Sequence, residues 1–253
     1  MNNLKIFTSM EEFETAKPSM DTPFVVLEKG TSKVIYSNLL EITEEELPEG
    51  VVDLGLSVNW ASCNIGANSP CESGLLFQFG RVDGYAYGDT SNQFRTSEQN
   101  TADTGSQYIP ATTSGTVYKV GEVLKSADDA ASVATNGAMR MPTAAEIDEL
   151  LANTKNQWCQ CTVLGADHTG HTIYGRLFTS NKDESKKIFI PAAGYFDSNG
   201  SFGYGGSFGC VWSSSVRTDF VNGGYYLFFT SSDCNRYDDY RFHGFSVRGV
   251  CSK

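Results

Sequence analysis

Between Ser213 and Ser252 the chain has no lysine, glutamate, glutamine, methionine or tryptophan, although the rest of the sequence uses all five. Basic residues are scarce overall: 19 lysines and arginines stand against 30 aspartates and glutamates, and the formal net charge is -11. Binding to a nucleic-acid backbone requires a basic face. We therefore expect no nucleic-acid partner, and the composition of the C-terminal stretch needs another explanation.

Long apolar runs are also missing. No stretch reaches the roughly 18 apolar residues of a membrane-spanning helix, so we expect no membrane insertion. The opening residues, MNNLKIFTSMEEFETAK, carry Glu11, Glu12 and Glu14 where a signal peptide has its apolar region. We therefore expect no signal peptide, and synthesis and folding in a cytoplasm.

Cysteines number seven, an odd count that fits mostly free thiols in a chain without a signal peptide. Cys159 and Cys161 alternate on an expected strand, so both point to one face. We interpret them as small core residues, because no second pair has zinc-site spacing.

Motifs for catalysis or metal binding are scarce as well. The GADHTGH stretch (165–171) lies at an expected hairpin tip, where Asp167, His168 and His171 are more typical of a polar turn than of a zinc site. DCNRYD (233–238) resembles the start of a calcium loop, but Gly244 occupies the twelfth position, where an acidic ligand is required. We expect no catalytic residue, no metal site and no cofactor.

Two further motifs also depart from the pattern that a functional site requires. GYGGSFG (203–209) departs from the dinucleotide-binding fingerprint and is interpreted as a glycine-rich loop. The serines at 213–215 have no histidine in a recognisable triad setting.

The chain divides into two regions. Residues 1–48 predict a small α+β module with a helix in TSMEEFETAK capped by Ser9, two strands in FVVLEKGTSKVIYS, and an acidic connector from Glu41 to Gly50. Residues 49–253 predict one larger domain. Its middle, from about Asp89 to Tyr118, is expected to be a long loop.

Two helices are expected in the larger domain before a run of strands. One lies in SADDAASVATNG with Ser126 as its cap, and the other begins after Thr143 with Glu146 at the capping-box position. The segments QWCQCTVLG, TIYGRLFTS, KKIFIPAAGYF, VWSSS, GYYLFFTSS and GFSVRGV then read as strands. This order predicts an α+β fold.

The expected strand YYLFFTSS explains part of the unusual tail. Alternation places Tyr225, Leu227 and Phe229 toward the core, and Tyr226, Phe228 and Thr230 on the opposite, exposed face. That face adjoins two expected loops, VRTDFVNGG and SDCNRYDDYRFH. Rigid aromatics with short polar residues are typical of a paratope. The alternative is a core strand covered on both faces and flanked by ordinary polar loops.

Five blocks occur in order through the larger domain: VDLGLSVNWASCNIGANSP, SGLLFQFGRVDGY, DDAA…MRMPTAAEIDELL, GRLFTS…IFIPAAGY and VWSSS…GFSVRGV. They resemble the C-type-lectin-fold domains of Bacteroides and their phages, related to the formylglycine-generating-enzyme version of that fold. The resemblance implies a C-type lectin fold of this subtype, preceded by the small α+β module.

In that family, segments bracketed like WSSS…GFSVRG are often variable regions of diversity-generating retroelements, in which template adenines are mutagenised. Mutagenised asparagine codons ending in C or T cannot encode Lys, Glu, Gln, Met or Trp, the five residues absent here. The resemblance implies that the variable, ligand-binding positions are Arg217, Asp219, Phe220, Asn222, Gly223, Tyr226, Phe228, Thr230, Asp233, Asn235, Tyr237, Asp238, Asp239, Tyr240 and His243. It implies a fixed scaffold of Tyr225, Leu227, Phe229, Arg241, Gly244, Phe245, Val247 and Arg248.

The resemblance also implies a function. We expect a non-enzymatic phage or prophage receptor-binding or adhesion protein, located in the virion, that contacts a bacterial cell-surface protein or glycan. The N-terminal module resembles leading segments of Bacteroides phage structural proteins, which implies contacts with virion proteins or with sister chains in a homo-oligomer such as a trimer. The calcium-dependent sugar motif and the cysteine pair of the formylglycine-generating enzymes are both missing. A degenerate enzyme of that type and a fixed structural virion subunit remain alternatives.

Overall fold

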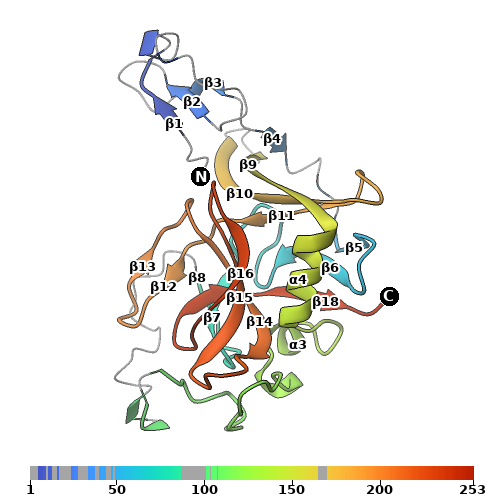
Figure 1. The fold of residues 1–253 in the computed structure, drawn as a ribbon, viewed down its shortest axis with the longest axis vertical. Coiled ribbons are helices and arrows are strands. Elements are labelled where there is room, and N and C mark those ends of the chain that lie inside the picture. Colours follow the sequence, from blue (N-terminus) through green and yellow to red (C-terminus); the bar gives the residue numbers. More distant parts are fainter. Residues whose placement is uncertain are drawn as a thin grey trace.

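Strands dominate the computed structural model, which has a mixed α+β fold with few helices (Figure 1). The structure describes residues 5–9, 11–12, 16, 24–27, 34–37, 40–43, 47, 49–86, 101–102, 104–106, 108–164 and 170–253. The predicted tip residues Asp167 and His168 and the side chain of His171 lie outside this set. So do residues 89–100, 103 and 107 of the predicted loop from Asp89 to Tyr118. None of the helices in the described ranges has the length and apolarity needed to cross a bilayer.

A small sheet at the N-terminal end contains β1 (Lys5–Phe7), β2 (Phe24–Leu27) and β3 (Val34–Ser37). This sheet precedes β4 (Leu40–Thr43) in the chain and lies at one end of the molecule (Figure 1). The predicted N-cap of the first helix is present, because Glu12 N donates to Ser9 Oγ at 3.2 Å. The last residues of that expected helix lie partly outside the described set.

Strand β4 corrects the prediction of a connector from Glu41 to Gly50. It pairs in parallel with β9 (Thr154–Leu164), with Leu40 opposite Cys159, and completes a sheet in the order β11-β10-β9-β4. The other members are β10 (Gly170–Ser180) and β11 (Lys187–Pro191). Ile42 is buried in this sheet's apolar cluster. The acidic composition of this segment does not favour a strand. The strand forms because the free edge of β9 supplies its hydrogen-bond partners.

Cys161 lies in the core, as predicted, but it is not a free thiol, because it forms a disulfide with Cys71. The two cysteines are 90 residues apart in the sequence, and only the packing of β9 brings their Cα atoms within 6.3 Å. The other cysteines are free, which agrees with the expectation of mostly free thiols: Cys63, Cys159, Cys210, Cys234 and Cys251.

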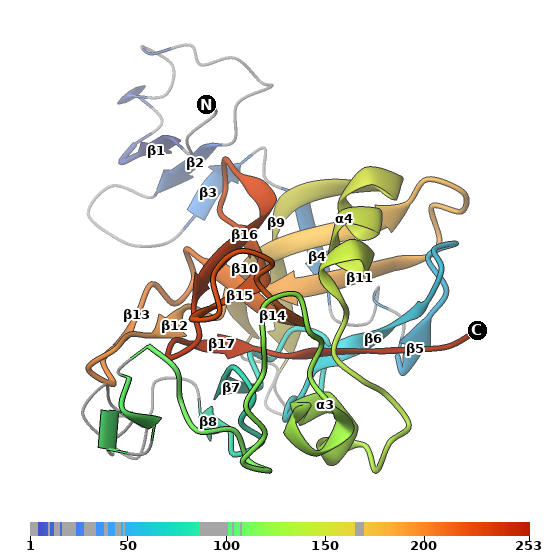
Figure 2. The ribbon, with the colours of Figure 1, turned by 60° about the horizontal axis from the view of Figure 1, so that its bottom comes forward.

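The largest sheet carries the C-terminal tail. Its order is β13 (Phe202–Gly203), β12 (Tyr195–Phe196), β17 (Gly244–Ser246), β14 (Gly209–Val216), β15 (Gly223–Phe229) and β16 (Cys234–Tyr240), while β7 (Leu75–Gln78) pairs with β17 and with β8 (Tyr85–Ala86). A three-stranded sheet of β18 (Arg248–Cys251), β6 (Asn59–Asn64) and β5 (Val51–Val52) joins the two ends of the larger domain (Figure 2).

Helix α4 (Ala144–Asn153) begins as predicted. Thr143 Oγ1 accepts from Glu146 N, and the Glu146 carboxylate accepts from Thr143 N in return, so both halves of the capping box are present. The preceding segment instead splits into the 3-10 helix η2 (Ser126–Asp128) and α3 (Ala130–Ala134). Asp129, rather than the predicted Ser126, caps α3 by accepting from Ser132 N at 2.8 Å.

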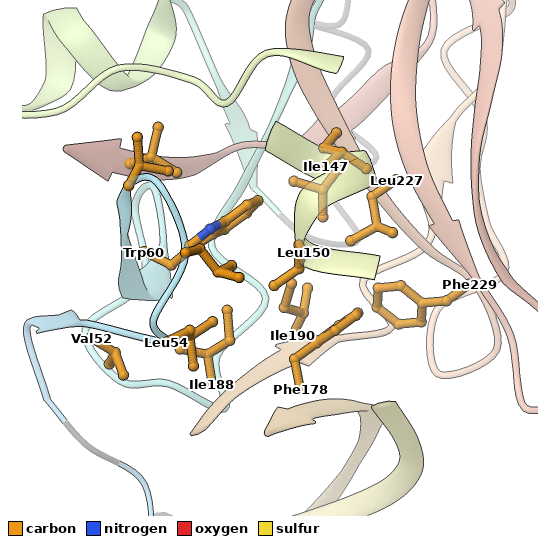
Figure 3. Packing of buried hydrophobic residues seen from close by; sticks show 14 of the residues in the cluster. Val52, Leu54, Trp60, Ile147, Leu150, Phe178, Ile188, Ile190, Leu227 and Phe229 are labelled. Carbon is orange, nitrogen blue, oxygen red and sulfur yellow. The ribbon is translucent and has the colours of Figure 1, made fainter. Parts of the chain in front are cut away.

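The main core lies between α4 and the strands, and Figure 3 shows its side chains meeting there. Helix α4 contributes Ile147 and Leu150, while β15 contributes Leu227 and Phe229. A second cluster, which includes Trp212 of β14, covers the other face of β15. The central strands of the tail are therefore packed on both faces.

Candidate functional site

Strands β15 and β16 form the rigid support of the C-terminal surface. They pair antiparallel over seven positions, with Tyr226 opposite Tyr237 and Phe228 opposite Asn235. The segment SDCNRYDDYRFH was predicted to be a loop, and the strand β16 within it corrects that prediction. Aspartate and asparagine have low intrinsic strand preference, but the regular ladder with β15 overrides it.

Strand β14 fixes this hairpin to the rest of the domain. Trp212 Nε1 donates to Phe77 O at 2.9 Å, which joins β14 to β7. Ser213 Oγ donates to Tyr225 O at 2.7 Å, and Ser214 Oγ donates to Pro142 O at 3.2 Å. These two serine hydroxyls therefore join β14 to its neighbours.

Most positions that were predicted to vary lie at the surface of this hairpin and its adjoining turns. The exposed ones are Asp219, Phe220, Asn235, Tyr237, Asp238 and Tyr240; the half-buried ones are Arg217, Asn222, Phe228, Thr230, Asp233, Asp239 and His243. The predicted scaffold is buried except for half-buried Tyr225: Leu227, Phe229, Arg241, Gly244, Phe245, Val247 and Arg248.

Tyr226 and Gly223 are exceptions, and they correct the prediction of one exposed strand face. Tyr226 is 8% exposed and packs against Phe245 and Trp212, with ring centroids 4.6 and 5.7 Å away. Gly223 is buried, and a Cβ there would lie 3.2 Å from Arg217 Cδ. Strand alternation identified the two faces correctly but could not show that the second face is covered by its own apolar cluster.

One face of the hairpin carries an aromatic patch, which we define as Tyr204, Phe208, Phe228 and Tyr237. Phe228 meets Phe208 and Tyr237 edge to face, with centroid separations of 5.4 and 5.6 Å. Tyr204 stacks on Phe208 at 4.4 Å and is itself 56% exposed. Such contacts hold large apolar rings in fixed orientations at the surface.

Sequence reasoning missed Tyr204 and Phe208, which lie in the stretch interpreted only as a glycine-rich loop. Gly194 N donates to Phe208 O at 2.8 Å, and this bond holds the loop beside β12. Two aromatic residues between glycines, in a polar segment without apolar periodicity, were the available signal for a surface role.

Hydrogen bonds orient the polar edge of the aromatic patch. Asp233 accepts from the Tyr237 hydroxyl at 3.0 Å and from Asn235 Nδ2 at 2.6 Å. The Asp233 contact raises the pKa of Tyr237, because a neighbouring carboxylate favours the protonated phenol. Thr230 Oγ1 accepts from Asp233 N at 3.1 Å and closes the turn between the strands.

The other face and the preceding turn form a charged patch, which we define as Arg217, Asp219, Phe220, Asp238 and Tyr240. Arg217 pairs with Asp219 at 2.6 Å and also with Asp238, while its guanidinium lies 5.7 Å from the Phe220 ring centroid. The Asp219 hydrogen bond is the main cause of the raised Arg217 pKa, and Arg217 in turn lowers the pKa of Asp219. Phe220 meets Tyr240 edge to face at 5.8 Å.

Burial disfavours the thiolate form of three of the free cysteines. Burial raises the pKa of Cys234 to about 11, and it raises the pKa of Cys210 still further. Burial also raises the pKa of Cys159 to about 12. Because the thiolate is the reactive form, a raised pKa reduces the reactive fraction of these thiols at neutral pH.

Together, the two patches can contact a partner through aromatic surface area and through hydrogen bonds. They offer fixed rings, short polar side chains and both signs of charge on a paired hairpin, which are features of protein-recognition surfaces.

Comparison of the chain with family models, curated proteins and solved structures finds no match.

Proposed function

We propose that this chain is a non-enzymatic binding protein with a C-type lectin fold of the formylglycine-generating-enzyme-like subtype. Its C-terminal surface is diversified by a retroelement and contacts a bacterial cell-surface protein or glycan. The chain acts as a receptor-binding or adhesion component of a phage or prophage, and residues 1–48 attach it to the virion or to sister chains.

The contacts among the five resembling blocks support the fold assignment. Arg248, in the last block, donates to Asn64 Oδ1 at 2.9 Å in the first block and to Phe189 O at 2.9 Å in the fourth. The Trp212 bond joins the last block to Phe77 in the second. Ser214, in the last block, bonds to Pro142 in the third. The blocks thus form one connected frame, as expected if they are the constant part of a family.

The observation that carries the proposal is the division between surface and interior along the tail. Positions expected to vary alternate with scaffold positions in the sequence, yet all but two of them reach the surface, and the scaffold positions except Tyr225 are buried. A surface that is changed by mutagenesis requires this arrangement, because substitutions in a packed interior cost several kcal/mol, roughly 2–5 for a large-to-small change.

Sequencing the gene in many isolates across codons 213–252 tests the diversification directly. We expect differences concentrated at the predicted variable codons, with Trp212, Leu227 and Gly244 constant. Variation at Tyr226 should be narrower than at Tyr237, because Tyr226 is packed against Trp212. An adjacent reverse transcriptase gene and an adenine-rich imperfect repeat should accompany the locus.

Even scatter of differences across these codons, or none at all, would contradict the diversification. A fixed structural subunit would then explain the same hairpin, and its aromatic patch would be buried in the assembled particle. Accessibility of Tyr237 to a tyrosine-modifying reagent in intact particles separates the two functions.

A further inference from the structure

A second binding feature lies beside the hairpin, in a cavity of about 510 Å³ between residues 104, 109–112 and 115–118 and the turn before β15. Its walls include Ile109, Pro110, Val117 and Val221, and Arg241 also lines it. Val117 is 89% exposed, so the cavity reaches solvent at its rim. Its size and apolar walls fit a small organic molecule.

Arg241 contributes a positive charge to the wall of this cavity. The residue is 1% exposed, and its guanidinium lies 5.1 Å from the Phe79 ring centroid. Among the described residues, the only hydrogen bond of the Arg241 side chain is a long one, from Nη1 to Val221 O at 3.4 Å, and the buried Nε has no partner. A guanidinium has five N–H donors, so most of its hydrogen-bonding capacity is unused.

The buried carboxylate of Asp128 does not satisfy this arginine. Asp128 accepts from Ser114 N and Ser114 Oγ, both at 2.6 Å, and from the Tyr118 hydroxyl at 2.8 Å. Its charge acts on Arg241 only through space. Burial lowers the pKa of Arg241 to about 10, which still leaves the guanidinium protonated at neutral pH.

We propose that this cavity binds an apolar monocarboxylic acid, with the carboxylate accepting hydrogen bonds from Arg241 and the hydrocarbon part lying against Ile109, Pro110 and Val221. A planar guanidinium matches a carboxylate in charge and in geometry. The occupant supplies the anion that the buried arginine lacks, since an unpaired buried charge is costly.

This site is separate from the proposed diversified surface. None of the residues that line the cavity is among the positions predicted to vary, and Arg241 was assigned to the fixed scaffold. The cavity would therefore bind the same class of ligand in every variant of the tail.

Titration of the full chain with octanoate and, separately, with octanol tests the site by isothermal calorimetry at neutral pH. Octanol keeps the chain length but lacks the charge. We expect octanoate to bind at least roughly ten-fold more tightly, because a charge-assisted hydrogen bond exceeds a neutral one. Equal affinity for the two probes, or no binding of octanoate, would overturn the proposal.

Two variants locate the binding. Arg241→Met should weaken octanoate binding by roughly ten-fold or more, whereas Arg236→Met, which removes an arginine of β16 that does not line the cavity, should leave it unchanged. If Arg241→Met does not fold, Val221→Trp serves instead, because it fills the cavity from a half-buried turn and leaves Arg241 in place. Unchanged octanoate affinity in the variant that folds would refute the assignment. A sequencing result that rejects diversification would leave this test unaffected.

Discussion

Arg248 Nε donates to Asn64 Oδ1 at 2.9 Å across a fully buried contact, so the end of the tail is tied to strand β6. The same guanidinium donates to Ala61 O at 3.0 Å, to Ser62 O and to Phe189 O. Burial lowers its pKa to about 10, so it remains charged at neutral pH. One side chain therefore holds three parts of the larger domain together.

Replacing Arg248 with methionine should destabilise the protein by about 3–5 kcal/mol, because several buried acceptors lose their donor at once. Urea unfolding followed by circular dichroism measures the change. The matched control is Arg236→Met. Arg236 is partly exposed and pairs with Asp148 at 2.7 Å, so its loss should cost about 1 kcal/mol or less. Similar losses in the two variants would mean that the buried network does not hold the fold.

The division of the tail into surface and scaffold predicts that truncating a scaffold side chain destabilises the protein much more than truncating a surface side chain. Phe229→Ala should cost about 3–5 kcal/mol, since this fully buried ring packs against Phe178 in the main core. Tyr237→Ala should cost about 0.5 kcal/mol or less, because Tyr237 is 45% exposed. Thermal unfolding of both variants checks this. A large loss at Tyr237 would show that it belongs to the scaffold.

Reduction of the Cys71–Cys161 disulfide should lower the free energy of unfolding by about 2–5 kcal/mol, because the bond closes a long loop in the unfolded chain. Urea unfolding with and without dithiothreitol provides the measurement. A Cys71→Ser/Cys161→Ser variant should match the reduced protein and be insensitive to the reductant. Cys63→Ser, which removes a free thiol, should keep the full response. If the reductant has no effect on the native chain, the two sulfurs are not bonded.

The capping box of α4 predicts a dependence on pH. Burial opposes ionisation of Glu146, but the bonds from Arg140 and Thr143 outweigh it and lower the pKa of Glu146 below its ordinary value. The ionised carboxylate therefore favours the folded state. This stabilisation is complete above the ordinary value of 4.5 and is lost as the pH falls through the lower, folded-state pKa.

The free energy of unfolding, measured between about pH 7 and 3, should therefore fall less steeply in Glu146→Gln than in the native protein. The neutral amide cannot titrate, so the two curves should converge at low pH. Parallel curves would show that Glu146 does not contribute to the acid sensitivity.

Local sequence patterns determined several elements of this protein. The capping box fixed the start of α4, because it depends on residues within one helical turn. Alternation fixed which residues of β15 share a face and identified Leu227 and Phe229 as core residues. These features could be read from the sequence because the physical interactions that cause them span only a few residues.

Contacts between distant segments decided the rest. Strand β16 exists because β15 offers a ladder, β4 because β9 has a free edge, and the disulfide because folding brings Cys71 to Cys161. Burial of Tyr226 follows from the position of Phe245, and the cavity at Arg241 follows from a loop far from it in sequence. Composition alone identified the tail as a binding surface to be tested, but only the tertiary structure determined which of its side chains reach solvent, because that depends on what packs against each face.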